Sequence, residues 1–502
     1  MNRKIGALLS YVCMILEVLS TLLLTPFIIA SLGDAEYGIY KLVAALSGYL
    51  LLLDLGMGNS VIRFVAKFKE NNDLESNRKY IGVTLVFYVI VSIAVFALGG
   101  IIYASFQDIF AKGLAPQEIE LGKKLLILTV INAAVTLATS VFINILMAYS
   151  KFSLVKGASI LQIVLRVIVT MIALKQGFGS IAIVAINLGL TVMVRGFYTL
   201  YVLFVMKLRP KLRGADISFI KDIISYSSFI FLQMVATQIN GYADQVLLGM
   251  LVSSSAAIIG IYGVGAQLVQ YFQSIGQAIG GVLMPGVVKM VESGASPRQL
   301  QDEMVRIGRY SFAMLGMIFV GFLINGETFL KLWVGEGYRQ SYYIALMLML
   351  AYLFIITEGI GTQILWAKNR HQAQSILKLA IVIANVVLTV FLIHWEPLIG
   401  AALGTFISLL IGDVLCMNVV FKKEIGISIK GYYGGLFKGI LPCLALSGLS
   451  GYAVSLLSLT GIVGFAINLS VMLAVYALMM WLFGFRQSEK SMLLGLLKRL
   501  KK

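Results

Sequence analysis

A series of long apolar runs is the feature that most restricts what this chain can fold into. The hydrocarbon core of a bilayer is about 30 Å thick, so a helix needs about 20 mostly apolar residues to cross it. Backbone polar groups cannot stay unpaired in lipid, so these runs are predicted to be helices. We predict an all-α, polytopic membrane protein with about 14 transmembrane helices. The predicted spans are 5–30, 39–60, 80–104, 124–148, 157–174, 180–206, 223–250, 257–284, 310–330, 342–366, 377–395, 398–420, 437–457 and 461–484.

Composition and loop length exclude several classes of protein. Hydrophobic residues make up 59% of the 502 residues and charged residues 13%, whereas about 25% of an average soluble domain is charged. This excludes a soluble enzyme, a nucleic-acid-binding protein and a disordered chain. The longest predicted loop, 285–309, has 25 residues, and a separate catalytic domain needs at least about 50 residues. We therefore expect that the protein is not an enzyme.

The positions of lysine and arginine predict the orientation in the membrane. With the N-terminus in the cytoplasm, 31 of the 40 Lys and Arg residues fall in cytoplasmic segments and seven fall outside. Such a bias over short loops orients membrane proteins. We expect a multi-pass protein of a bacterial-type cytoplasmic (inner) membrane, with both termini in the cytoplasm. The charged N-terminus is interpreted as the start of the first span and not as a cleaved signal peptide.

An internal repeat divides the chain. A shift of 222 residues aligns Gly38-Ile39-Tyr40 with Gly260-Ile261-Tyr262, and both segments open a predicted span after a short external loop. This predicts two six-helix lobes related as a parallel repeat, with substrate bound between them near the midplane. The predicted parts are an N-lobe at 1–206 (helices 1–6), a C-lobe at 223–420 (helices 7–12), helices 13–14 at 437–484, and a basic cytoplasmic tail at 485–502.

The basic tail has two interpretations. Its leucines recur at near-helical spacing beside lysine and arginine, which suits an amphipathic helix on the inner leaflet. The alternative is a frayed basic tail that only completes the topology.

Ionisable side chains inside the spans are the main candidates for function, because they are costly in lipid and usually face a cavity or a partner. Lys41, Arg166 and Arg195 place cations in the first lobe, which suits a phosphate-bearing substrate. The acids of the second lobe have no buried cation, and desolvated carboxylates suit proton or Na⁺ coupling. The acids within spans are Glu17, Asp54, Asp244, Glu358 and Asp413.

A structural interpretation of these charges stays open beside the functional one. Glu17 or Asp54 would pair with Arg166 or Arg195 and only fix the register of the helices. Asp54 and Asp413 are also near enough to the inner interface to extend toward it.

Polar stripes on the seventh and eighth predicted spans add to the candidates. Side chains that recur at positions i, i+4, i+7 and i+11 share one helix face. Amides in lipid must face protein or water. A cavity for sugar hydroxyls needs such donors and acceptors; the alternative is hydrogen bonding between helices. The stripes are Gln233, Thr237, Asn240 and Asp244, and then Gln267, Gln270, Gln273 and Gln277.

Motifs for cofactors are missing from the sequence. Three scattered cysteines and two distant histidines predict neither a disulfide framework nor a metal site. The chain also has no Walker-type phosphate loop, so it is not expected to use ATP itself. We expect no cofactor and no metal.

Three segments resemble polysaccharide exporters. Pro26 late in the first span, and then Leu-Gly…Tyr-Gly and Asp-Leu-Gly followed by a basic residue within 32–63, resemble their opening signature. The segment 240–249 resembles their seventh-helix motif, and Leu332-Trp-Val-Gly335…Tyr338 resembles their external loop before helix ten. Over about 1–420 the chain is thus similar to the Wzx-type flippases of the multidrug/oligosaccharidyl-lipid/polysaccharide (MOP) exporter superfamily, and its 14 predicted spans match the longer members.

The resemblance implies a MATE-like fold and a transport function. A polyprenyl-diphosphate-linked oligosaccharide would move from the inner to the outer leaflet by alternating access, and the acids within the spans favour coupling of this movement to an H⁺ or Na⁺ gradient. The expected partners are this lipid-linked glycan, membrane lipids and other polysaccharide-assembly membrane proteins, and no nucleic acid. Two alternatives in the superfamily stay open, a cation-coupled multidrug exporter and a peptidoglycan-precursor flippase.

The site predictions combine these arguments. The residues expected to bind substrate are Arg166, Arg195, Lys41, Glu17, Asn240, Gln267 and Gln273. The residues expected to bind the coupling ion are Asp244 and Glu358.

Overall fold

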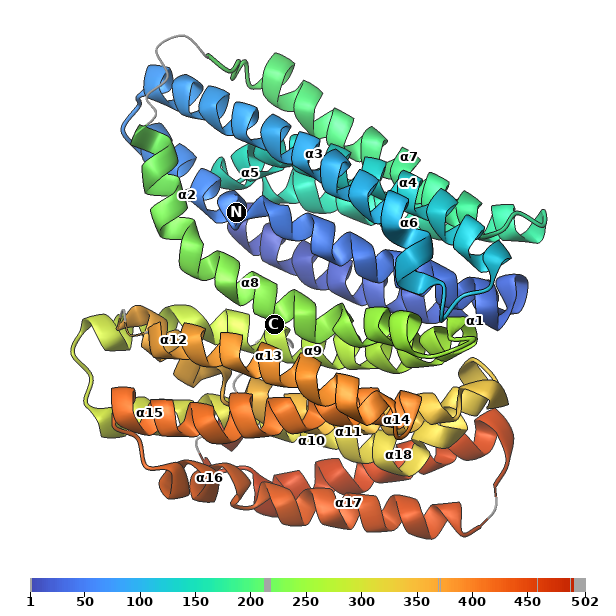
Figure 1. Cartoon of the computed structure of the whole chain (residues 1–502). Coiled ribbons are helices and arrows are strands. Elements are labelled where there is room, and N and C mark those ends of the chain that lie inside the picture. Colours follow the sequence, from blue (N-terminus) through green and yellow to red (C-terminus); the bar gives the residue numbers. More distant parts are fainter. Residues whose placement is uncertain are drawn as a thin grey trace. The chain divides into compact units, whose positions relative to one another are not determined.

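The computed structural model describes residues 2–211, 218–368, 370, 372–457, 459–487 and 489–491. In these residues the regular elements are helices and no strand occurs, which confirms the predicted all-α fold (Figure 1). The α-helices are α1 (Asn2–Leu51), α2 (Met57–Glu70), α3 (Leu74–Phe110), α4 (Pro116–Ala138), α5 (Ser140–Ala148), α6 (Phe152–Lys175), α7 (Ser180–Leu200), α8 (Ser218–Leu251), α9 (Ala256–Glu292), α10 (Pro297–Trp333), α11 (Gln340–Thr357), α12 (Gly359–Ala367), α13 (Gln372–Ile393), α14 (Pro397–Ser408), α15 (Met417–Ile425), α16 (Ile429–Phe437), α17 (Ile440–Ser455) and α18 (Gly461–Met479). Short 3₁₀ or π-helical elements are η1 (Leu52–Asp54), η2 (Tyr201–Val205), η3 (Glu336–Tyr338), η4 (Leu409–Cys416) and η5 (Met480–Gly484).

The helices coincide with the predicted spans. Across the described ranges, ten helical stretches are long and apolar enough to cross a membrane, or up to eleven if the bent pair α16–α17 is one span. The first stretch, Leu9–Glu70, contains two predicted spans, because α1 is broken at Gly33. Helices α8 and α9 coincide with two further predicted spans. The chain is therefore a multi-pass membrane protein, and the count of about 14 spans stays a prediction.

The chain divides into two compact units. Unit 1 comprises Met1–Gly263 and Thr389–Ala401, and unit 2 comprises Val264–Leu388 and Ala402–Lys502. Within unit 1, α3 packs on α4, and α1 packs on α4, α6 and α8. Within unit 2, α10 packs on α11, α16, α17 and α18. The predicted lobes at 1–206 and 223–420 stay a prediction, and the predicted tail helix lies largely outside the described residues.

Three breaks interrupt the long helices. Gly33 has φ 76° and ψ 168° inside α1, a conformation that glycine adopts without steric cost. Leu55 and Gly56, with φ 52° and 73°, separate η1 from α2. Gly439, with φ 81°, separates α16 from α17, which meet at a bend of 45°. Breaks of this kind leave backbone N–H and C=O groups that side chains can bind.

The two repeated Gly-Ile-Tyr segments lie against each other in unit 1. A Cβ atom on Gly38 would be 1.7 Å from the carbonyl oxygen of Ala256 and 3.2 Å from the amide nitrogen of Gly260. A Cβ atom on Gly260 would be 3.5 Å from the amide nitrogen of Gly38. Glycine therefore allows α1 and α9 to approach closely at this point. The segments that the repeat aligns thus form a helix crossing.

Candidate functional site

A charged pair joins α1 to α6 in unit 1. Nη2 of Arg166 donates to Oε1 of Glu17 at 2.7 Å and to the hydroxyl of Ser20 at 3.3 Å. The Arg166 side chain remains 29% exposed and the Glu17 side chain 49% exposed. Both helices are apolar enough to span a membrane. The pair is the interhelical contact of the structural interpretation, and both of its side chains stay partly exposed.

The second acid of unit 1, Asp54, lies at the break between η1 and α2. The hydroxyl of Tyr88 donates to its Oδ1 at 2.9 Å, and the N–H of Gly58, in the first turn of α2, donates to Oδ2 at 3.5 Å. Arg195 on α7 is near enough for its charge to attract that of Asp54. Its Nη1 is buried and has no hydrogen-bond partner among the described residues. Each predicted arginine thus has its own acidic neighbour, and Arg195 keeps one donor unused.

The third predicted cation, Lys41, lies on α1 after the break at Gly33. Its Nζ is 5.3 Å from the centre of the Tyr37 ring, within reach of a cation–π interaction. Its aliphatic stem packs beside Gly263 of α9, where an added Cβ would be 3.0 Å from Cγ of Lys41. The neighbouring Tyr40 interacts electrostatically with Arg166. This part of α1 therefore lies near the Arg166 pair.

Asp244 on α8 is buried and bound by two neutral hydroxyl groups. Tyr262 on α9 donates to its Oδ2, and Thr389 at the end of α13 donates to its Oδ1 at 3.3 Å. Sequence reasoning selected Asp244 and missed both partners. Tyr262 carried a signal, because it closes the repeated Gly-Ile-Tyr segment, whereas Thr389 looks like any other residue of an apolar helix.

The predicted amide stripes are only partly buried. Asn240 and Gln273 are partly exposed, and Gln267 is buried and donates to the hydroxyl of Tyr271 at 2.8 Å. Gln238, which lies outside the predicted stripe, donates to the backbone carbonyl of Gly48 at 2.7 Å. The amides therefore include groups used between helices and groups left accessible.

Glu358 lies at the junction of α11 and α12 in unit 2 and is 2% exposed. Asn418 on α15 and Tyr433 on α16 donate to its Oε1. Sequence reasoning missed both donors, because neutral side chains in or beside apolar runs carry no charge signal. Nearby, Asp413 in η4 binds Nζ of Lys378 on α13 at 2.9 Å.

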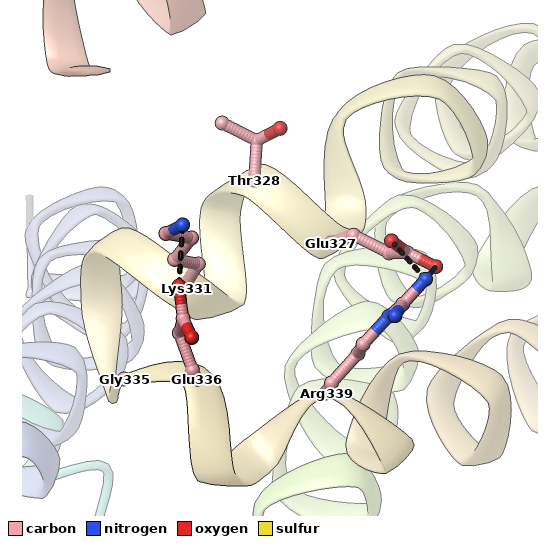
Figure 2. A pocket seen from close by; sticks show the side chains of 6 residues that line it. All are labelled: Glu327, Thr328, Lys331, Gly335, Glu336 and Arg339. Carbon is pink, nitrogen blue, oxygen red and sulfur yellow. Dashed lines mark hydrogen bonds and ion pairs between the residues drawn. The ribbon is translucent and has the colours of Figure 1, made fainter. Parts of the chain in front are cut away.

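A charged pocket of about 330 Å³ lies at the end of α10 in unit 2, and Gly335 of the predicted loop motif is one of its lining residues (Figure 2). Two exposed ion pairs line it, Lys331 with Glu336 at 2.5 Å and Arg339 with Glu327 at 3.3 Å. Gly335 has φ 101° and lets the chain turn between the two pairs. Since each charge already has an opposite partner, the pocket presents no excess of either sign.

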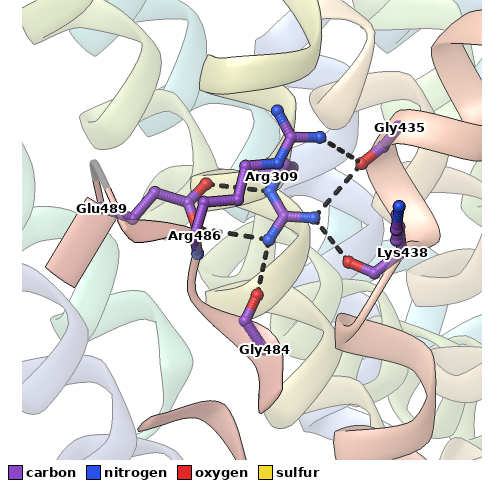
Figure 3. A network of polar contacts seen from close by, with 6 residues as sticks. All are labelled: Arg309, Gly435, Lys438, Gly484, Arg486 and Glu489. Atoms are coloured by element: carbon purple, nitrogen blue, oxygen red, sulfur yellow. Dashed lines mark hydrogen bonds and ion pairs between the residues drawn. The ribbon is translucent and has the colours of Figure 1, made fainter. Parts of the chain in front are cut away.

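One expectation for the second lobe is wrong. We expect no buried cation there, yet Arg309 is 2% exposed and binds Glu489, which is 4% exposed, at 2.8 Å. Its remaining N–H groups donate to the backbone carbonyls of Gly435, Lys438 and Gly484 (Figure 3). The error arises because Arg309 precedes the predicted span 310–330, whereas α10 begins at Pro297.

Metal ligands do not gather anywhere in the part of the chain that the structure describes. No group there of three or more His, Cys, Asp or Glu side chains could hold a metal ion.

Comparison with known proteins assigns the family. A family model described as polysaccharide biosynthesis protein matches residues 4–291, more than half of the 502 residues. The chain belongs to the polysaccharide biosynthesis protein family. This match confirms the resemblance to polysaccharide exporters. The matched residues of this chain include Arg166, Arg195 and Asp244.

Curated relatives and solved structures extend the family match. The chain is 21% identical over 408 residues to a putative O-antigen transporter of Shigella flexneri, covering 79% of this chain and 92% of the relative. It is 20% identical over 408 residues to the probable flippase AglR of Haloferax volcanii, covering 80% of this chain and 79% of the relative. The fold is similar to that of the Lipid II flippase MurJ in an inward closed conformation, with a TM-score of 0.70, 16% identity and coverage of 94% of this chain and 97% of that one. It is also similar to an inward-facing multidrug resistance MATE transporter of the MOP superfamily, with a TM-score of 0.65, 13% identity and coverage of 82% and 96%. The MATE-like fold that the sequence predicts is thereby confirmed.

Proposed function

We propose that this chain is a flippase that moves a polyprenyl-diphosphate-linked oligosaccharide across the membrane by alternating access. The observation that carries the proposal is the Arg166–Glu17 pair, which stays partly exposed on apolar helices of a polysaccharide biosynthesis protein. Charges on such helices usually face a water-filled path or a ligand. The relatives described as an O-antigen transporter and a flippase support the proposal, and so do the short predicted loops, which leave no room for an enzyme domain.

The diphosphate is proposed to bind the cations of unit 1. Arginine offers a planar fork that matches phosphate oxygens. The Arg166 side chain stays partly exposed, and Nη1 of Arg195 has no partner in the described structure. The substrate would compete with Glu17 for Arg166, and Lys41 would add a third charge. Asn240, Gln267 and Gln273 are proposed to bind sugar hydroxyls.

Ion coupling is proposed at Asp244 and Glu358. Both carboxyl groups are buried, and the contacts found for them include hydroxyl and amide donors. Burial makes the charged form of a carboxyl group costly, so binding and release of a small cation can favour different conformations. The transporter is proposed to lie in a bacterial-type cytoplasmic membrane with both termini in the cytoplasm, and to work beside other polysaccharide-assembly membrane proteins.

A vesicle assay tests the proposed function. Purified protein is placed in vesicles with a fluorescent polyprenyl-diphosphate oligosaccharide, and flipping is followed with a quencher that cannot cross the membrane. Arg166→Ala and Arg195→Ala are each expected to slow flipping by about tenfold or more, since a hydrogen bond to a charged group contributes about 1.5–3 kcal/mol. Arg306→Ala is the control, because Arg306 is 58% exposed and pairs with Glu303. Normal flipping by both test variants would overturn the assignment of this site.

The same vesicles separate the alternatives within the superfamily. The likeness to the Lipid II flippase and to a multidrug transporter concerns the fold. Flipping of a peptidoglycan precursor, but not of other diphosphate-linked oligosaccharides, would support the precursor flippase. Uptake of a cationic drug without flipping of either lipid would support the drug exporter.

A further inference from the structure

The carboxyl group of Glu358 is only half satisfied. Its Oε1 accepts from Nδ2 of Asn418 at 2.9 Å and from the hydroxyl of Tyr433. Its Oε2 is buried and has no hydrogen-bond partner within the described structure, and no ion pair found there includes Glu358. A buried polar atom without a partner costs about 1–3 kcal/mol, and more when it is charged. This oxygen therefore indicates a missing donor.

Asn418 supplies a second unsatisfied oxygen in the same cluster. Its Nδ2 lies near three acceptors: Oε1 of Glu358, the carbonyl of Val414 at 2.8 Å and the hydroxyl oxygen of Tyr433 at 3.0 Å. These three contacts fix which end of the amide carries the nitrogen. Oδ1 of Asn418 is buried and also has no partner in the described residues. The cluster thus holds two bare acceptor oxygens, and neither has a donor.

We propose that Glu358 and Asn418 form a proton-binding site, with the proton held on Oε2 of Glu358. A proton there removes a buried negative charge and turns one of the two bare acceptors into a donor. This deepens the proposed function, on which it rests, by naming the proton as the coupling ion at this position. A protonated carboxylic acid and a primary amide are also complementary, since each can donate one hydrogen bond to the other and accept one in return.

The charges around Glu358 favour the neutral acid. Asp413 in η4 interacts with Glu358 as a like charge, and it is itself held by Lys378 of α13. On α10, the charge of Arg309 is bound to Glu489. A negative charge on Glu358 would therefore face an acid, while Lys378 and Arg309 are bound to other carboxylates.

The ionisable groups on the two remaining neighbouring elements do not offset this. Lys422 and Lys423 of α15 and Lys430 of α16 are exposed, and Glu424 of α15 pairs with Arg370. Tyr432 of α16 donates its hydroxyl to the carbonyl of Thr357 at 2.9 Å, and Tyr433 donates to Glu358 itself. The single donor from α16 therefore reaches Oε1 and leaves Oε2 available for the proton.

The contacts of Glu358 join the junction of α11 and α12 to the bent pair α16–α17. Glu358 lies where α11 ends and α12 begins, and the hydroxyl of Tyr433 ties it to α16, which the bend at Gly439 joins to α17. Loss of the proton would leave a buried charge whose stabilisation needs water or a change in these contacts. Proton release would thus favour a conformation in which α12, α15 and α16 part and water reaches Glu358.

Two measurements on the purified full-length protein test the site without transport. In an infrared difference spectrum between wild type and Glu358→Gln at neutral pH, the carbonyl band of a protonated carboxylic acid is expected to be lost. The melting temperature of wild type in detergent is expected to fall by about 2 °C or more as the pH rises from 5 to 9, because the folded state keeps a proton that the unfolded chain releases. The decrease in melting temperature that Glu358 causes between pH 5 and 9 should be missing in Glu358→Gln and retained in the control Glu424→Gln.

Tyr433→Phe sharpens the test, because it is a small change that removes one donor to the carboxylate. Without that donor the charged form is less stable, so the pH of proton release should rise. A carboxylate band for Glu358 at neutral pH, or a melting temperature that responds to Na⁺ and not to pH, would overturn the proton site. If the wild-type protein does not flip the lipid in the vesicle assay, that result counts against the proposed function alone, since the infrared and melting measurements do not depend on transport.

Discussion

Two Arg–Glu pairs, one in each unit, show opposite ways of placing charge in a membrane protein. Arg166 and Glu17 meet through one charged hydrogen bond and stay 29% and 49% exposed. Arg309 and Glu489 are 2% and 4% exposed. There the guanidinium binds both carboxylate oxygens and three backbone carbonyls. The same two residue types thus form an open pair and a sealed one.

The difference separates charges that hold the fold from charges that can act on a ligand. A buried guanidinium needs all its N–H groups satisfied, and Arg309 reaches the ends of α16 and η5 as well as Glu489. It therefore fixes the last helices of unit 2 to α10. Arg166 contacts a carboxylate and one hydroxyl, which leaves capacity for a phosphate.

The largest expected effect comes from breaking the sealed pair. Arg309→Ala leaves the carboxylate of Glu489 and three carbonyls buried without this donor. Removing one partner of a buried pair costs about 3–5 kcal/mol, so we expect a lower melting temperature and a poor yield of folded protein. The measurement is thermal unfolding in detergent beside Arg306→Ala, whose side chain is exposed. Equal melting temperatures for the two variants would show that the sealed pair does not stabilise unit 2.

A smaller loss is expected when the sealed pair keeps its shape but loses one charge. Glu489→Gln retains an acceptor for Arg309 and leaves the guanidinium charge uncompensated. A hydrogen bond to a charged group contributes about 1.5–3 kcal/mol, so the loss of stability should fall below that of Arg309→Ala. The same unfolding experiment measures it. A loss as large as that of Arg309→Ala would mean that charge, and not the hydrogen-bond network, dominates at this site.

Acid should weaken the sealed pair. Burial raises the pKa of Glu489, but the hydrogen bonds from Arg309 and from the N–H of Arg486 outweigh it and hold the pKa below its ordinary value. Stability from this group is therefore present above the pKa of an unfolded Glu, about 4.3, and is lost as the pH falls through the lower folded value. Unfolding below pH 4 should be less steep with pH in Glu489→Gln. An unchanged acid dependence would contradict the assignment.

How far the sequence predicts this structure depends on whether the signal is local. Apolar runs are properties of neighbouring residues, so the helices could be expected. The repeat aligns Gly38 with Gly260, but nothing in the alignment predicts that the two glycines lie against each other. The buried Arg309 could not be expected either, because its window looks like a loop and its partner Glu489 is 180 residues further along the chain.

In the candidate sites, too, the sequence shows the residues with a local signal and not their distant partners. Glu358 and Asp244 stand out because a charge within an apolar run is rare. Their partners Tyr433 and Thr389 are neutral and carry no such signal, and only the packing of distant helices brings them together. Sequence therefore selects the ionisable centre of each cluster, and the structure supplies the residues that define its chemistry.

The smallest effect on stability is expected at the open pair. Glu17→Gln should change the free energy of unfolding by less than about 1 kcal/mol, since exposed ion pairs contribute little. If Glu17 competes with the diphosphate for Arg166, the same variant should bind a soluble diphosphate-linked headgroup more tightly, which calorimetry can measure. Arg166→Ala should abolish that gain when the two changes are combined. If Glu17→Gln destabilises the fold as much as Glu489→Gln and the affinity for the headgroup does not rise, the open pair is a structural contact like the sealed one.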